Sequence, residues 1–326
     1  MPVLMLILAI EIPEALSKWK ISYAPAAALV RDGGESLLFH NAEVYYYDKE
    51  GNLIRNFKLT MVPREAFMGN GDSVWLHDGQ ALLGFLNANH NMQWQREMPP
   101  PSLAPLPFGD YLVYANENRV FVLEPEDGST RFSLRLDHAA APMKVHDGMI
   151  LIADSGGDVV AWDPLAEIEQ TIYSSKDRLL QYLAVSEEGA WALAYGGGKL
   201  KVLRENRHLR WKRDFRIEIS VPPLWLSPDD REQLVVATHG RTLLAYGPRG
   251  EQLARKLLQG RPKALIPWDD ETCLLVPERV NRLIWYHARE HTFGVEEIGS
   301  YQTLVASRGD FVLMVANDGI IRLYRK

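Results

Sequence analysis

The sequence has little cysteine, no excess of positive charge and no long apolar run. The chain of 326 residues has one cysteine, Cys273, so a disulfide within the chain, a CxxC pair and a cysteine-rich zinc site are excluded. The net charge of −6 argues against a nucleic-acid partner. Apolar residues make up 47% of the chain and charged residues 24%, values that are ordinary for a globular protein.

The apolar run at the N-terminus, Val3 to Ile10, is too short to cross a membrane, because a spanning helix needs ~20 apolar residues. No Lys or Arg precedes it, and Ile7-Leu8-Ala9 is a poor version of a signal cleavage pattern. Two interpretations stay open: the end of a secretory signal, or an apolar strand or tail packed on the body. We treat residues 1–15 as an N-terminal tail or signal remnant and predict one domain over residues 16–326, with no membrane span.

A pattern of strand, polar turn and strand recurs along the chain. One copy is Met149 to Ala153, a Gly-rich turn over residues 154–158, and Val159 to Trp162. The second strand of each unit begins at intervals of 37 to 43 residues, near Ser36, Ser73, Tyr111, Met149, Ala190, Gln233, Thr272 and Phe311. Such a fixed period indicates a repeat architecture.

Each unit is expected to hold four short antiparallel strands. The first strand usually ends in Asp, Asn or Gly, as at Asp147-Gly148 and Gly309-Asp310, which favour tight turns. The inner strands are apolar on both faces, whereas a sheet with one wet face alternates. Four antiparallel strands per ~40 residues form a β-propeller blade, whose inner strands are buried between neighbouring blades. The sequence therefore predicts an all-β fold, an eight-bladed β-propeller.

Ring closure can be predicted by counting strands. Seven units are complete, and the chain ends at Lys326 after the third strand of the eighth. An orphan segment, Leu16 to Ser22, contains Trp19 and resembles the outer strands around Trp94 and Trp211. We expect this N-terminal strand to complete the last blade and remove the open edge of the ring. A seven-bladed ring with a decayed terminal unit is the alternative.

The repeats resemble those of the pyrroloquinoline-quinone (PQQ) repeat propellers. Residues 157–163, Gly-Asp-Val-Val-Ala-Trp-Asp, fit that family's blade, and Trp19, Trp94 and Trp211 lie where its outer-strand Trp falls. The family comprises quinoprotein dehydrogenases, which bind PQQ and calcium over the central channel, and non-catalytic scaffolds such as the BamB-like periplasmic lipoprotein of outer-membrane protein assembly.

The short connections and the single cysteine favour the scaffold branch, since many of the dehydrogenases stack their cofactor on a vicinal disulfide. The resemblance thus implies a periplasmic or envelope-associated scaffold without a cofactor. Its partner would be another protein, such as a subunit of a membrane or envelope complex. A quinoprotein-type oxidoreductase or another enzyme with a site at the central channel is the alternative, as is a cytoplasmic location.

Two local motifs resemble catalytic or ligand-binding patterns. His287-Ala288-Arg289-Glu290-His291 spells H-x-x-E-H, but it falls at a predicted turn, and the zinc-protease chemistry needs both histidines on one helical face. Gly196-Gly197-Gly198-Lys199 precedes a strand, whereas a phosphate loop leads into a helix. We therefore predict hairpin turns at both places, and no catalytic, cofactor-binding or metal-binding residue.

The densest basic stretch is predicted on the outermost strand of the fifth blade. It combines an aromatic residue with cations, a composition that can bind an acidic partner. A solvated face is the other interpretation. The possible partner-binding residues are Arg204, Arg207, Arg210, Trp211, Lys212 and Arg213.

Overall fold

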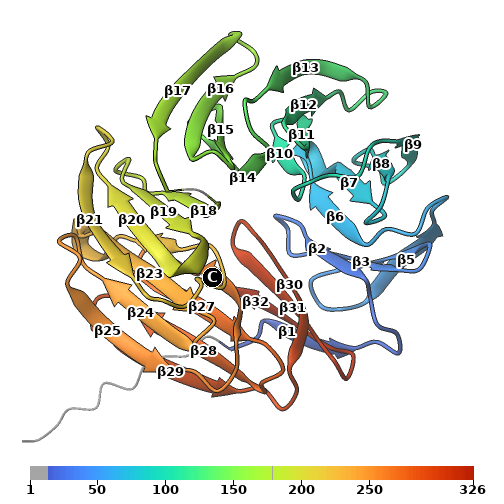
Figure 1. The fold of residues 1–326 in the computed structure, drawn as a ribbon. Helices are drawn as coiled ribbons and strands as arrows, with labels where there is room; N and C mark the ends of the chain where they lie inside the picture. Colours follow the sequence, from blue (N-terminus) through green and yellow to red (C-terminus); the bar gives the residue numbers. More distant parts are fainter. Residues whose placement is uncertain (1–13, 178) are drawn as a thin grey trace, which may run out of the picture.

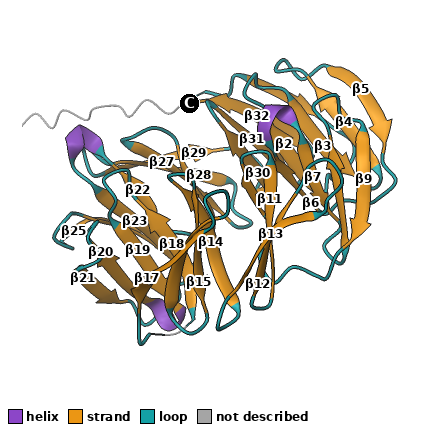
Figure 2. Ribbon diagram, turned by 90° about the horizontal axis from the view of Figure 1, so that it is seen from above, coloured by secondary structure: helices purple, strands orange, loops and turns teal. Residues whose placement is uncertain are grey.

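The structure is a ring of eight antiparallel sheets, each of four strands (Figure 1). It is a computed structural model that describes residues 14–177 and 179–326. Within these ranges the helical elements are three single turns of 3-10 helix, η1 (Asn70–Asp72), η2 (Gly196–Gly198) and η3 (Pro228–Asp230) (Figure 2). The predicted eight-bladed β-propeller is confirmed, and the seven-bladed alternative is wrong.

The strands of each blade follow one another in sequence, apart from the last blade. Blades 1 to 4 consist of β2 (Ala27–Val30), β3 (Ser36–His40), β4 (Glu43–Tyr47) and β5 (Leu53–Lys58); β6 (Glu65–Met68), β7 (Val74–His77), β8 (Leu82–Leu86) and β9 (Met92–Glu97); β10 (Leu106–Phe108), β11 (Tyr111–Asn116), β12 (Arg119–Leu123) and β13 (Thr130–Arg135); and β14 (Ala140–His146), β15 (Met149–Asp154), β16 (Asp158–Asp163) and β17 (Ile168–Ser174).

Blades 5 to 8 consist of β18 (Leu180–Val185), β19 (Trp191–Tyr195), β20 (Lys199–Leu203) and β21 (Leu209–Asp214); β22 (Leu224–Leu226), β23 (Gln233–Thr238), β24 (Thr242–Tyr246) and β25 (Gln252–Leu257); β26 (Pro262–Pro267), β27 (Thr272–Pro277), β28 (Arg282–His287) and β29 (Thr292–Glu297); and β30 (Gln302–Arg308), β31 (Phe311–Ala316), β32 (Ile320–Arg325) and β1 (Ser17–Lys20). Every second strand begins within one residue of its predicted start.

The first strand of each blade lies toward the centre of the ring, and the fourth lies at the periphery (Figure 1). First strands of neighbouring blades contact one another around the centre, as β2 contacts both β6 and β30. They therefore surround the central channel. Short turns join antiparallel neighbours, as expected from the Asp, Asn and Gly residues between them.

The apolar core is divided into eight clusters, one between each pair of neighbouring blades. In blade 4, Ile150 and Ile152 pack toward blade 3, while Leu151 and Ala153 pack toward blade 5. Alternate residues of one strand thus belong to different clusters, which explains why the inner strands are apolar on both faces. The single cysteine, Cys273, is fully buried in the cluster between blades 6 and 7, where burial raises the pKa of its thiol.

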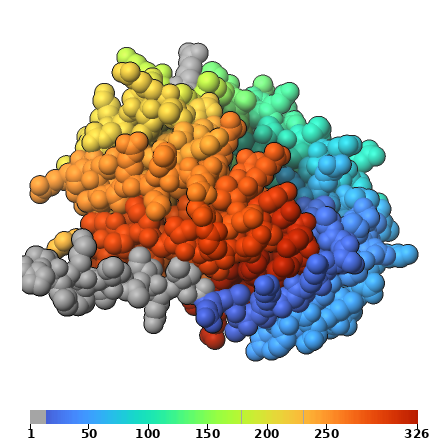
Figure 3. Space-filling model, turned by 90° about the horizontal axis from the view of Figure 1, so that it is seen from below, coloured from blue at the N-terminus to red at the C-terminus, as the bar shows by residue number. Residues whose placement is uncertain are grey.

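The N-terminal strand closes the ring, as predicted. β1 pairs antiparallel with β32, and Trp19 lies opposite Ile321. Ile21, just after β1, donates its backbone NH to the Gly319 carbonyl at 2.9 Å and packs in the cluster between blades 8 and 1. The space-filling view shows the N-terminal and C-terminal parts of the chain side by side at this seam (Figure 3). No edge of β32 is left unpaired.

Three outer-strand tryptophans pack on a glycine in the next blade. Trp19 covers Gly51, Trp94 covers Gly128, and Trp211 covers Gly250. All three glycines have positive φ, and a Cβ on Gly128 would lie 2.6 Å from the Trp94 ring. The Trp94 indole NH also donates to the Pro125 carbonyl at 2.7 Å. Glycine is needed here both for its φ and for the close approach of the indole ring.

The predicted N-terminal tail, residues 1–15, lies outside the described residues except for Glu14 and Ala15. Of these, Ala15 packs against the cluster between blades 7 and 8. In the part of the chain that the structure describes, none of the helical turns has the length and apolar character needed to cross a membrane.

The tryptophan contact can be tested by adding one methyl group at Gly128. Gly148 is a matched control, because its φ of 72° is close to the 69° of Gly128 and an added Cβ there meets nothing within 4 Å. We expect Gly148→Ala to lower the free energy of unfolding by about 1 kcal/mol through φ alone. Gly128→Ala should cost about 1–3 kcal/mol more, because Trp94 must move. Equal losses in chemical denaturation would show that the contact does not constrain the blades.

The seam can be tested by truncation. A chain that begins at residue 22 lacks β1 and Ile21, and its β32 edge is open. We expect its free energy of unfolding to fall by at least about 3 kcal/mol, because the buried contacts of Trp19 and Ile21 are lost. We also expect concentration-dependent association in size-exclusion chromatography, through the open edge. A chain that begins at residue 14 retains β1 and is the control; if both chains behave alike, β1 does not close the ring.

Candidate functional site

One face of the ring bears a carboxylate in a turn of every blade. Each blade places the turn between its first and second strands on this face, and blades 1 to 7 add the turn between their third and fourth strands. We call it the acidic face. The opposite face, which we call the linker face, holds the turns between second and third strands and the links between blades. The carboxylates of the first turns are Asp32, Asp72, Asp110, Asp147, Glu187, Asp229, Asp269 and Asp310.

Five cavities lined by described residues open on the acidic face. Their volumes range from about 380 to about 630 Å³, and their lining residues come from the turns of this face and the strand ends beside them. Two of them lie at the mouth of the central channel, and the others lie farther out between neighbouring blades. Volumes of this size are typical of sites that hold a small ligand or a side chain of a partner.

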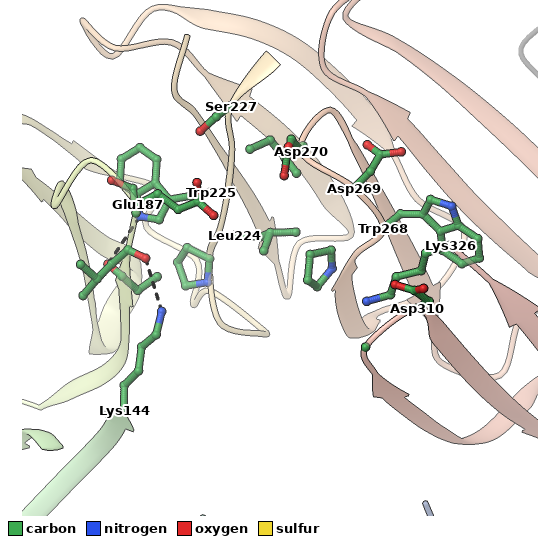
Figure 4. Close-up of a pocket in the computed structure, with 17 residues that line it drawn as sticks. Lys144, Glu187, Leu224, Trp225, Ser227, Trp268, Asp269, Asp270, Asp310 and Lys326 are labelled. Carbon is green, nitrogen blue, oxygen red and sulfur yellow. Dashed lines mark hydrogen bonds between the residues drawn. The ribbon is translucent and has the colours of Figure 1, made fainter. Parts of the chain in front are cut away.

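The cavity at one side of the channel mouth, which we call the mouth cavity, has a volume of about 430 Å³. Its lining residues come mainly from blades 5 to 8, and blade 4 adds Lys144 (Figure 4). Leu224, Trp225 and Pro267 give it an apolar wall. Trp225 is half-buried, and its indole NH points to the Ala184 carbonyl at 3.5 Å.

Four exposed carboxylates surround the mouth cavity, and we call them the mouth carboxylates: Glu187, Asp269, Asp270 and Asp310. None of them forms an ion pair with another residue in the described parts of the chain. Two lysines, Lys144 and Lys326, also line the cavity. Burial lowers the pKa of both amines. The four acids outnumber the two cations, so the charged residues that line the cavity have a net negative charge.

The other side of the channel mouth differs in its charge. The cavity there, of about 470 Å³, is lined by Leu29, Phe67, Met68 and Pro107, together with Arg308. Two of the first-turn carboxylates beside it form ion pairs, because Arg308 pairs with Asp32 and Arg31 pairs with Asp72. A third, Asp110, is exposed and forms no ion pair among the described residues. The channel mouth therefore has apolar walls on both sides, and the four mouth carboxylates of blades 5, 7 and 8 lie together at one side of it.

The structure disperses the predicted basic stretch of blade 5. Arg210 pairs with Glu232 of blade 6 at 2.8 Å, and that buried carboxylate also accepts a hydrogen bond from Ser186. Trp211 is buried on Gly250, as described above. Arg213 donates to the Gly250 carbonyl at 2.6 Å. These contacts hold blade 5 against blade 6.

The other three residues of the stretch do not form one surface either. Arg207 lies over the ring of Trp191 at 4.1 Å, in its own blade. Lys212 is exposed on β21, while Arg204 is exposed in the turn before it. Arg204 and Arg210 line a cavity of about 630 Å³ between blades 5 and 6, together with Glu188 and Glu205. A role of the six residues in binding a partner stays a prediction.

Both local motifs lie in turns, as predicted. His287 ends β28, and His291 precedes β29, so H-x-x-E-H spans a hairpin. Gly196 to Gly198 form η2, which joins β19 to β20. Among the described residues, no group of three or more His, Cys, Asp or Glu side chains is placed to hold a metal ion.

The mouth cavity is not predicted by any local motif of the sequence. Its residues come from five blades, and Lys144 and Lys326 lie far apart in the chain. A usable signal was present, because an acidic residue recurs in the first turn of each repeat. Each of these residues taken alone indicates a turn, and the repeat places all of them on one face.

The chain is similar in structure to several known proteins. No protein-family model and no curated protein sequence matches it. The computationally designed Ika8 protein has a TM-score of 0.75 at 12% identity, with 96% of this chain and 99% of that chain covered. BamB from Moraxella catarrhalis has a TM-score of 0.74 at 12% identity, with 97% and 98% covered. BBS1N, solved in complex with ARL6DN, has a TM-score of 0.57 at 14% identity, with 78% and 88% covered. At these identities the likeness shows the β-propeller fold alone.

Proposed function

We propose that this protein is a non-enzymatic β-propeller scaffold that binds another protein through its acidic face. The observation that carries this proposal is the set of five cavities that open on that one face. The strands below them are fixed by eight apolar clusters, so the turns are presented on a rigid frame. Concave sites with apolar walls and a polar rim are typical of surfaces that recognise a partner.

The partner is proposed to be a subunit of a membrane or envelope complex, and the protein to be periplasmic or envelope-associated in a bacterium. The resemblance of the repeats to the scaffold branch of the PQQ-repeat propellers supports this proposal, as does the structural similarity to BamB. The complex of BBS1N with ARL6DN is a structural neighbour bound to another protein, which is consistent with a protein partner here.

The role of the acidic face can be tested by blocking it with a bulky polymer. Cys273 is fully buried and its thiol pKa is raised, so a maleimide should react only with an added cysteine. Glu187→Cys and Ala88→Cys place the polymer at two cavities of the acidic face. Gln80→Cys, in an exposed turn of the linker face, is the matched control.

We expect the two acidic-face conjugates to lose the partner that co-purifies with the unmodified protein from native extract, at least about tenfold by quantitative mass spectrometry. The Gln80 conjugate should retain it. Loss only with the Gln80 conjugate would move the interface to the linker face. Retention by all three conjugates would contradict a scaffold role of the acidic face.

The compartment can be tested with two reporters fused after Lys326 and expressed from the native gene. One is a phosphatase that is active only where disulfides form, and the other is a protein that fluoresces only when it folds in the cytoplasm. We expect phosphatase activity without fluorescence. Fluorescence without phosphatase activity would favour the cytoplasmic alternative.

A further inference from the structure

We infer that the mouth cavity binds a cationic linear segment of the partner, in which an apolar side chain packs on Trp225 and flanking Lys or Arg side chains meet the mouth carboxylates. This inference rests on the proposed function and adds the chemistry of the partner.

The wall of the cavity provides a rigid aromatic anchor. Trp225 directs its indole NH at the Ala184 carbonyl, at 3.5 Å, and remains partly exposed in the cavity. Trp268 lies farther round the wall and is fixed by an edge-on contact with Trp285, at 4.6 Å between ring centres. A fixed aromatic surface loses little conformational entropy when an apolar side chain packs on it, so such residues often dominate binding energy.

The charge around this wall selects the sign of the partner. On blades 1, 2 and 6, first-turn carboxylates are paired with arginines: Arg308 with Asp32, Arg31 with Asp72 and Arg289 with Asp229. The mouth carboxylates have no such partner among the described residues. Cations from a bound segment can pair with them, whereas nucleic acid or an acidic peptide meets like charge.

The two lysines of the cavity do not reverse this preference. Lys144 extends to the Val185 carbonyl at 3.4 Å. Lys326 lies beside Asp310, and the carboxylate of Asp310 favours the charged form of the Lys326 amine (Figure 4). The amine of Lys144 is directed at the wall of the cavity. The acids on the rim are thus the charges that a segment entering from solvent encounters first.

The shape of the site favours a linear segment over a folded surface. The cavity holds about 430 Å³ and lies inside the ring of first turns, with Pro267 and Leu224 on its wall. An extended chain can place one or two side chains in this space, while a flat surface of a folded domain cannot reach its floor. This mode matches short peptide motifs that combine apolar anchors with charged flanks.

The test uses the full chain and three fluorescently labelled peptides of equal length. One has Lys and Arg around Leu and Trp; the second has Ser in place of Leu and Trp; the third has Glu in place of the basic residues. Fluorescence anisotropy should show binding of the first, and at least about tenfold weaker binding of the other two. Affinity for the first should fall as salt is added.

Variants of the protein locate the binding. Asp270→Asn combined with Asp310→Asn should lower the affinity for the first peptide about tenfold and reduce the dependence of that affinity on salt. Glu117→Gln combined with Glu278→Gln removes the same charge from exposed turns of the linker face and should change neither value. Trp225→Ala should weaken binding about 30-fold, and Trp225→Phe, which keeps an aromatic wall, much less. The carboxylate variants leave the core intact, so the result does not depend on the tryptophan variants.

Several outcomes would overturn the inference: no binding of the first peptide, equal binding of the acidic peptide, or the same loss in the linker-face control. The proposed function is tested by a different experiment, the polymer conjugates. The polymer at Glu187→Cys or Ala88→Cys can remove the natural partner although no cationic peptide binds. That result supports the scaffold role of the acidic face and contradicts a cationic segment in the mouth cavity. If neither conjugate loses the partner, the scaffold role of the acidic face is contradicted.

Discussion

The structure depends on burial of both faces of every blade against its neighbours. A single four-stranded sheet of about 40 residues cannot bury enough apolar surface to be stable alone. Here each second and third strand supplies alternate side chains to two clusters, as Ile150 and Leu151 do. The last blade must therefore meet the first, because an open ring leaves two such faces exposed to water. The pairing of β1 with β32 satisfies this requirement.

This constraint explains why so much of the fold could be predicted from the sequence. Apolar runs without alternation, interrupted by Asp-Gly turns, occur only where both faces of a strand are covered. The last repeat has three strands before Lys326, and the strand around Trp19 supplies the fourth. The three outer tryptophans marked the periphery correctly, since each lies on a glycine of the next blade. Local sequence and global packing agree in these elements, which is the condition for prediction without a structure.

The candidate site was less predictable, because its residues come together only when the ring is closed. Lys144, Trp225 and Asp310 belong to blades 4, 6 and 8, and no spacing in the sequence joins them. The basic stretch is continuous in sequence but not on the surface. Strand β21 alternates its side chains, so Trp211 turns inward while Lys212 stays in solvent. Density of charge along a strand is therefore a poor measure of charge on a surface.

A ring of repeats turns one acidic residue per blade into a circle of like charges. Asp269 shows how such a carboxylate can also form its turn, because it accepts a hydrogen bond from the backbone NH of Glu271. Their mutual repulsion is weak in water, and arginines reduce it further on blades 1, 2 and 6. Around the mouth cavity no arginine among the described residues pairs with the carboxylates, and Lys326 lies beside only one of them, Asp310. The repulsion that remains among the mouth carboxylates is lowered when a further cation binds, so the turns that connect the strands of the blades also favour a cationic partner at the channel mouth.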